Sequence, residues 1–210
     1  MSESPTGPLG GSSPGPKKRT RLGPAEAARL LSDDWEGRSY LALDVETTGL
    51  DLRRCRIVEI GAILFTPREG GFGGRSIDRL VDPGMPMPRE VIAIHGITDE
   101  DVRGAPSFGQ IADDFLALTE GAILVAHNAA FDLGFIQSEL AASGRPPLAN
   151  LVLDSLVLAR AAFKGLPSYS LPRLAASLHI ATRRSHRALD DAIVAAKVFV
   201  EAGRRLRPEA

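Results

Sequence analysis

The chain has 210 residues, of which 44% are hydrophobic and 24% charged, and its formal net charge is −1. This length and composition suit one globular domain with a full hydrophobic core. The near-neutral charge argues against a static binder of duplex nucleic acid, which would carry a basic stripe. It does not argue against an enzyme that holds a strand end through metal-loaded carboxylates, because bound cations make such a site locally positive.

The N-terminal region differs in composition from the rest of the chain. Gly, Pro and Ser supply 14 of the 24 residues of Met1–Pro24, so this segment is expected to be a flexible tail, with a short helical stretch at Ala25–Leu31. It has no apolar run typical of a signal peptide, and no window of the chain reaches the ~20 apolar residues of a membrane span. The single cysteine, Cys55, excludes an intramolecular disulfide. We therefore expect a soluble, cytoplasmic protein with no membrane partner, divided into a tail (1–34), one folded domain (35–203) and a short basic end (204–210).

Hydrophobic patterning predicts an α/β domain. Strands are predicted at Tyr40–Val45, Ile57–Phe65, Ser76–Val81, Ala122–Ala126 and Leu151–Leu153. Helices are predicted at Ser107–Leu118, Phe131–Ala142, Ser155–Phe163, Leu171–Leu178 and Arg187–Ala202, and Thr98 is expected to cap a further helix opening at Asp99–Asp101. Three strands joined by short connections, followed by strands separated by helices, indicate a mixed five-stranded sheet flanked by helices.

Two acidic residues lie at the exit of the first predicted strand. Side chains two apart on a strand point to the same face, so Asp44 and Glu46 should converge on one spot. Convergent carboxylates repel unless a cation lies between them, and oxygen ligands suit Mg²⁺ or Mn²⁺. A single solvated acid at a strand end is common, but two acids on one face favour a metal site.

Three further residues join this candidate site. Asp132 follows the fourth predicted strand, in the first turn of a helix, where capping and metal binding are both open interpretations. Asp191 shares a helix face with Ala188 and Ala195, small residues that would let the helix approach the sheet. His186 would lie about 140° from Asp191 on a helix, so it can join the site only from the preceding loop, where it suits a general base.

The segments Asp-Val-Glu-Thr-Thr-Gly, His-Asn-Ala-Ala-Phe-Asp and His-Arg-Ala-Leu-Asp-Asp resemble the three motifs of the DEDDh family of 3′→5′ exonucleases. That family includes the proofreading epsilon subunit of bacterial DNA polymerase III. The resemblance covers Tyr40 to about Val200 and implies an RNase H-like fold, two divalent cations held by Asp44, Glu46, Asp132 and Asp191, and His186 as the base. It also implies that Asp44 lies between both cations, with Glu46 and Asp191 on the nucleophile side.

By the same resemblance, the single-stranded or frayed 3′ end of DNA would be the substrate. The residues expected to contact it are Thr47, Leu50, His95, Asn128 and Phe131. For Leu50 and Phe131 a place in the core is an equal alternative, and for His95 so is a hydrogen bond to loop backbone. The two other histidines, His127 and His179, are assigned to structural roles.

The function predicted from these motifs is a metal-dependent exonuclease that releases nucleoside 5′-monophosphates, in DNA proofreading or repair. RNA trimming is the closest alternative, because nothing in the sequence decides how a 2′-hydroxyl is treated. A non-catalytic nucleic-acid-binding domain is a third interpretation, disfavoured by the presence of all five site residues. Because the sequence ends at Ala210, soon after the last predicted helix, both a free-standing nuclease and one with a DNA polymerase partner remain open.

Overall fold

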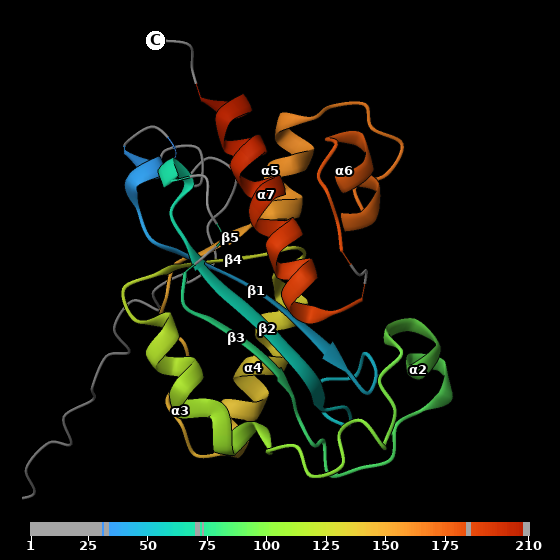
Figure 1. Cartoon of the computed structure of the whole chain (residues 1–210). Helices are drawn as coiled ribbons and strands as arrows, with labels where there is room; N and C mark the ends of the chain where they lie inside the picture. Colours follow the sequence, from blue (N-terminus) through green and yellow to red (C-terminus); the bar gives the residue numbers. More distant parts are fainter. Residues whose placement is uncertain (1–30, 32–33, 70–71, 73, 184–185, 208–210) are drawn as a thin grey trace, which may run out of the picture.

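The computed structural model describes residues 31, 34–69, 72, 74–183 and 186–207, and the predicted tail and its helical stretch up to residue 30 lie outside them. Figure 1 shows a twisted sheet with helices packed on both faces. The strands are β1 (Tyr40–Thr47), β2 (Ile57–Phe65), β3 (Ser76–Leu80), β4 (Ile123–Ala126) and β5 (Val152–Asp154). The α-helices are α2 (Arg89–His95), α3 (Phe108–Thr119), α4 (Ala130–Ala142), α5 (Ser155–Ala162), α6 (Leu171–Ser177) and α7 (Ala188–Leu206), and short 3₁₀ turns lie at η1 (Trp35–Gly37) and η2 (Pro67–Glu69).

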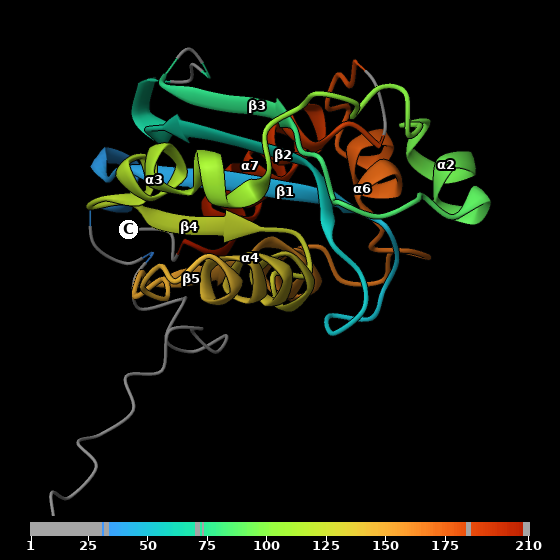
Figure 2. The same cartoon turned by 90° about the horizontal axis from the view of Figure 1, so that it is seen from below.

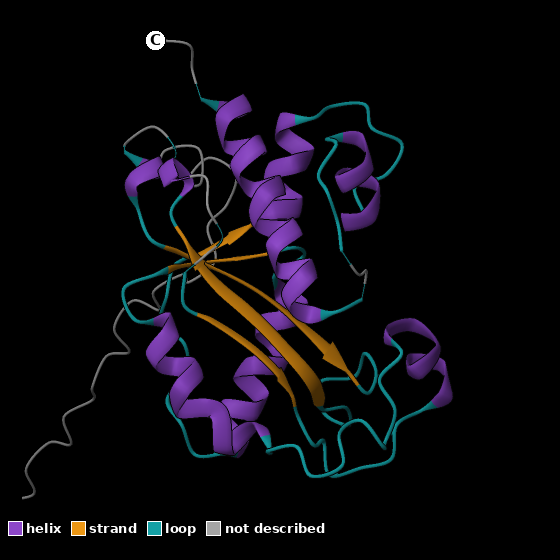
Figure 3. Ribbon diagram, in the orientation of Figure 1, coloured by secondary structure: helices purple, strands orange, loops and turns teal. Residues whose placement is uncertain are grey.

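The sheet is mixed, as the sequence predicts, with strand order β3-β2-β1-β4-β5. β1, β2 and β3 are antiparallel neighbours, whereas β4 runs parallel to β1 and β5 parallel to β4. The carboxyl ends of β1, β4 and β5 therefore meet at one edge of the sheet, which is where ligands bind in sheets of this kind. Figure 3 shows the strands of the sheet in orange and the helices that cover it in purple.

Each face of the sheet is covered by its own helices, and in Figure 2 α3 lies in front of the sheet and α7 behind it. Leu41, Leu43 and Val45 pack in one core cluster with α3 and α4. Tyr40 and Ala42 pack in another with α5 and α7. This alternation is the period-two pattern of a strand buried on both faces. The even-numbered side chains of β1 thus face α7.

Most predicted elements are confirmed, with shifts of a few residues at their ends. β1 continues two residues past its predicted end, and α7 continues four residues past its own, to Leu206. Leu31, the first described residue, is buried in the core cluster that includes α7. None of the helices within the described ranges is both long and apolar enough to span a membrane.

One predicted helix is wrong. Thr98 and Asp101 exchange the hydrogen bonds of a helix cap, with the Thr98 backbone nitrogen 2.8 Å from Asp101 Oδ2 and the Asp101 nitrogen 3.3 Å from Thr98 Oγ1. The chain nevertheless makes only turns here, because Gly104 adopts a positive φ of 80° and Pro106 follows. The helix that precedes this segment is instead the short α2, which the sequence patterns do not predict.

Candidate active site

The carboxyl end of β1 brings its two acids to one face of the sheet. Asp44 and Glu46 continue the α7-facing row begun by Tyr40 and Ala42, and both are half-buried. The register with β2 places Asp44 opposite Gly61 and Glu46 opposite Glu59, with an irregularity immediately after Glu46. The predicted convergence of Asp44 and Glu46 follows from this register.

Asp132 reaches the same strand from the first turn of α4. Its side chain is only 2% exposed, and its Oδ1 accepts a hydrogen bond of 3.1 Å from the backbone nitrogen of Val45, the residue between the two strand acids. The carboxylate therefore ties α4 to β1 instead of standing as a solvated helix cap. Of the two interpretations left open by the sequence, the structure favours a place in the acidic cluster.

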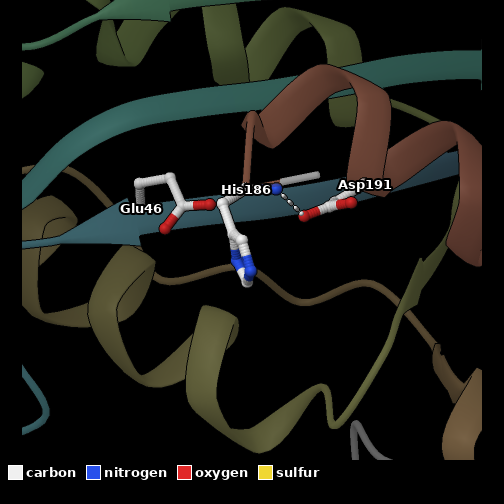
Figure 4. A group of neighbouring side chains, drawn as sticks. All are labelled: Glu46, His186 and Asp191. Atoms are coloured by element: carbon white, nitrogen blue, oxygen red, sulfur yellow. Dashed lines mark hydrogen bonds between the residues drawn. The ribbon is translucent and has the colours of Figure 1, made fainter. Parts of the chain in front are cut away.

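The third segment supplies Asp191 and His186. Asp191 lies in the first turn of α7, and His186 lies in the turn before that helix with a left-handed φ of 59°, which confirms that it comes from the loop. The backbone nitrogen of His186 donates to Asp191 Oδ2 at 3.0 Å. One ligand atom from each of Glu46, His186 and Asp191 lies within 4.8 Å of the others. In Figure 4 the Glu46 and Asp191 carboxylates point toward one another on either side of His186.

The small-residue face of α7 differs in part from the prediction. Ala188 is fully buried at the start of the helix, close to Gly61 of β2, as expected. Ala195 instead packs in a cluster with α5 and α6, because the helix face toward the sheet continues through Ala192 and Ala196. Ala188 therefore belongs to the close approach and Ala195 does not.

The electrostatics of the cluster favour bound cations. Burial raises the pKa of Asp44 well above its usual range, and the nearby carboxylates, Asp132 and Glu46 first among them, raise it further. Burial and then Asp191 raise the pKa of Glu46 to about 8, and burial is also the main cause of the raised pKa of both Asp132 and Asp191. Acids whose ionised forms repel this strongly are stabilised by a cation between them. Their oxygen donors, with one imidazole nearby, suit a hard divalent ion.

One charged residue near the cluster, Glu59, is not among the residues predicted from the sequence. Glu59 is 1% exposed and forms a salt bridge with Arg187, whose Nη2 lies 2.6 Å from Glu59 Oε1. A possible sequence signal was an acid within the apolar run Ile57–Phe65, a position where an unpaired charge is costly. No pattern in the sequence indicated Arg187 as its partner.

The predicted substrate residues lie in different environments. Leu50 is 83% exposed and Asn128 is exposed, so the core alternative for Leu50 is wrong. Phe131 is half-buried and packs on Phe135, with ring centroids 5.1 Å apart. His95 is buried, and its Nδ1 accepts a 3.0 Å bond from the Ile97 nitrogen, which is the loop hydrogen bond left open by the sequence.

Thr47 and the remaining histidines complete the surroundings. Thr47 is 6% exposed, and its hydroxyl donates to the Gly49 carbonyl at 2.7 Å. The two ring nitrogens of His127 lie 2.9 Å from Ser155 Oγ and from the Tyr169 carbonyl, which confirms a structural role. His179 follows Leu178, the C-cap of α6, and has a positive φ of 54°.

Comparison with known proteins places the chain in a family. Residues 41–199 match the sequence profile of the family described as Exonuclease, RNase T. The DNA polymerase III subunit epsilon of Treponema pallidum is 38% identical over 173 residues, covering 79% of each chain. That of Rickettsia conorii is 40% identical over 168 residues, covering 77% of this chain and 72% of the relative. The structure of E. coli exonuclease I in complex with a dA16 oligonucleotide superposes with a TM-score of 0.70 at 20% identity, covering 80% of this chain and 41% of that one, which shows a shared fold.

The chain belongs to the exonuclease family, and its mixed five-stranded sheet has the RNase H-like fold. It is a 3′→5′ exonuclease similar to the epsilon subunits of DNA polymerase III. The family profile spans β1 to α7 and so contains all five candidate site residues.

Proposed function

We propose that this exonuclease removes nucleotides from single-stranded or frayed 3′ ends of DNA and releases nucleoside 5′-monophosphates. The observation that carries the proposal is the convergence of acids from β1, α4 and α7 at one sheet edge, with His186 beside them. Such a cluster has no stabilising role of its own, because burying several like charges together destabilises a fold.

Two Mg²⁺ or Mn²⁺ ions would be held by Asp44, Glu46, Asp132 and Asp191. When bound, such ions neutralise the phosphate and lower the pKa of a bound water. The raised pKa values of these carboxyls support this role, because a cation offsets both their burial and their mutual repulsion.

His186 would act as the general base. Its side chain is exposed, its backbone is held by Asp191, and its ring lies beside the Glu46 carboxylate (Figure 4). From this position the imidazole can take the proton of the attacking water as the phosphodiester bond breaks and the 3′-oxygen leaves. A base on a short exposed turn can also release its proton to solvent before the next cycle.

The terminal nucleotide would lie against Thr47 and Asn128, with Leu50 as an apolar wedge. Leu50 follows the end of β1, the strand that carries Asp44 and Glu46, and its side chain is 83% exposed, so it is free to contact a ligand. The backbone nitrogen of Asn128 is held 3.1 Å from Asp154 Oδ1, so this loop is fixed in place. Contacts of this kind bind a strand end without reading its sequence, as an exonuclease requires.

The similarity to epsilon subunits supports proofreading alongside a DNA polymerase as the biological role. Addition of a bacterial replicative polymerase should then raise the rate on a mismatched primer end. Equal rates on matched and mismatched ends, with and without the polymerase, would instead favour a free-standing nuclease.

Degradation of 5′-labelled substrates tests the catalytic proposal. With Mg²⁺ or Mn²⁺, single-stranded DNA and mismatched duplex should give ladders that shorten from the 3′ end, and an equal ladder on RNA would extend the substrate class to RNA. His186→Ala should slow cutting by at least about a hundredfold while calorimetric Mn²⁺ binding is retained. Unchanged cutting by His186→Ala would refute the assignment of the base, and no degradation of any substrate by the wild type would refute the proposed function.

A further inference from the structure

Glu59 makes an unusually complete set of contacts for a buried acid. It is the third residue of β2, directly across from Glu46, and is 1% exposed. Arg187 Nε lies 2.9 Å from its Oε1 and 3.2 Å from its Oε2, and Arg187 Nη2 lies 2.6 Å from Oε1. The backbone nitrogen of Ala188 donates to Oε2 at 2.9 Å. Both carboxylate oxygens are therefore engaged, so Glu59 does not present a free oxygen to a cation.

The two partners of Glu59 occupy a particular place in the chain. Arg187 and Ala188 follow His186 immediately, and Ala188 is the first residue of α7, which carries Asp191 in its first turn. Asp191 Oδ2 in turn accepts a 3.0 Å hydrogen bond from the His186 backbone nitrogen. The turn that holds His186 is thus fixed at two points, one on β2 and one on its own helix.

This arrangement also balances charge beside the acids. Glu59 alone would add one more negative charge opposite Glu46. The guanidinium of Arg187 offsets that charge through a bidentate contact, which fixes orientation as well as distance. Removing the Arg187 guanidinium would leave the buried Glu59 carboxylate without a counter-ion, and removing the carboxylate would leave the guanidinium without one.

We propose that Glu59 is a positioning residue for the exonuclease reaction, acting through Arg187 and Ala188 to set His186 and Asp191 against the acids of β1. The inference rests on the proposed roles of His186 and Asp191. A displacement of about 1 Å in a reacting group costs on the order of a hundredfold in rate. Weakening the Glu59 contacts should therefore lower kcat while leaving KM for the strand end near its original value, because the proposed substrate contacts lie on other elements.

The chain contains a matched control in the pair of Arg56 and Glu139. Glu139 is 5% exposed, and Arg56 Nε and Nη2 approach its two oxygens at 2.7 and 2.6 Å. Glu139 also accepts a backbone bond, from Ile57 at 3.3 Å. It therefore has the same chemistry and burial as Glu59, but it joins the start of β2 to α4 and does not touch the His186 turn.

The test compares Glu59→Gln and Arg187→Lys with Glu139→Gln in the full chain. Kinetics on single-stranded DNA give kcat and KM, and hydrogen exchange reports on the amides of Ala188 and Ile57. Arg187→Lys keeps the positive charge and leaves the buried Glu59 and its bond to Ala188 in place, so it remains informative if Glu59→Gln folds poorly.

We expect Glu59→Gln to lower kcat by about 10- to 100-fold with KM within about threefold, and Arg187→Lys to show a smaller loss of the same kind. Exchange at Ala188 should quicken by about tenfold in Glu59→Gln, and exchange at Ile57 should not. Glu139→Gln should quicken exchange at Ile57 and leave kcat within about twofold.

Two outcomes would overturn the inference. The first is a wild-type kcat in Arg187→Lys and in any Glu59→Gln protein that folds. The second is a loss of kcat in Glu139→Gln as large as the loss in Glu59→Gln, which would mean that lower global stability is the cause. An inactive wild-type protein would instead contradict the proposed function itself, so the two failures are distinguishable.

Discussion

Replacing Gly61 by alanine should push α7 away from the active-site strand. A Cβ at Gly61 would lie 2.0 Å from the Leu189 nitrogen and 2.2 Å from the Ala188 carbonyl carbon, both backbone atoms at the start of α7. Restoring ordinary contact at about 3.5 Å requires the helix to move by roughly 1.5 Å. Because Gly61 pairs with Asp44 across the sheet, this movement separates Asp191 from the acid directly opposite the clash.

The expected cost has two parts. Overpacking of this kind destabilises by about 1–3 kcal/mol, which corresponds to a Tm lower by roughly 2–12 °C for a domain of this size. Displacement of Asp191 should lower kcat/KM by about a hundredfold, or about 2.7 kcal/mol of transition-state stabilisation. Thermal unfolding and exonuclease kinetics on the same preparation measure both.

Gly203→Ala, at the other end of the same helix, is the control. A Cβ at this position would lie 2.8 Å from Trp35 Cη2, so this substitution also overpacks α7. The contact lies twelve residues beyond Asp191, which is about 18 Å along the helix. It should lower Tm and leave kcat/KM within about threefold. Wild-type kcat/KM in a folded Gly61→Ala protein would refute the argument that the close approach of α7 sets the site.

The remaining predictions concern His186, the acidic cluster and Leu50. His186→Ala should lower kcat by about 10²–10⁴-fold without a change in Tm beyond about 2 °C, measured by single-turnover kinetics and thermal unfolding. In EDTA the protein should lose stability as pH rises from about 5 to 8, because folding raises the pKa of Glu46 from 4.5 to about 8 and the carboxyl group therefore ionises in the folded state over this window. Mn²⁺ should raise Tm more at pH 8 than at pH 6, because it binds the ionised carboxylates. Equal Tm shifts at the two pH values would contradict the argument that the carboxylates repel one another. Leu50→Ala should leave Tm unchanged because the side chain is 83% exposed, but raise KM for single-stranded DNA by about fivefold, and an unchanged KM would remove Leu50 from the substrate surface.

Local sequence patterns predicted the strands of the sheet and part of the site. The period-two pattern of β1 fixed that Asp44 and Glu46 share a face, because that geometry is local to a strand. Helical geometry likewise required His186 to precede α7, and the structure places it in that turn. The extra helix predicted after Thr98 was wrong because a local capping signal was present, but Gly104 and Pro106 stop the helix from continuing.

The contacts between segments far apart in the chain could be seen only in the folded structure. The bond from Val45 to Asp132 and the contact of Gly61 with the start of α7 join segments 87 and more than 120 residues apart, and neither leaves a periodic trace in the sequence. Glu59 is the clearest case, because its sequence context reveals a buried acid but not the arginine 128 residues away that neutralises it. Pairing across such distances depends on strand register and helix docking, which only the assembled fold specifies.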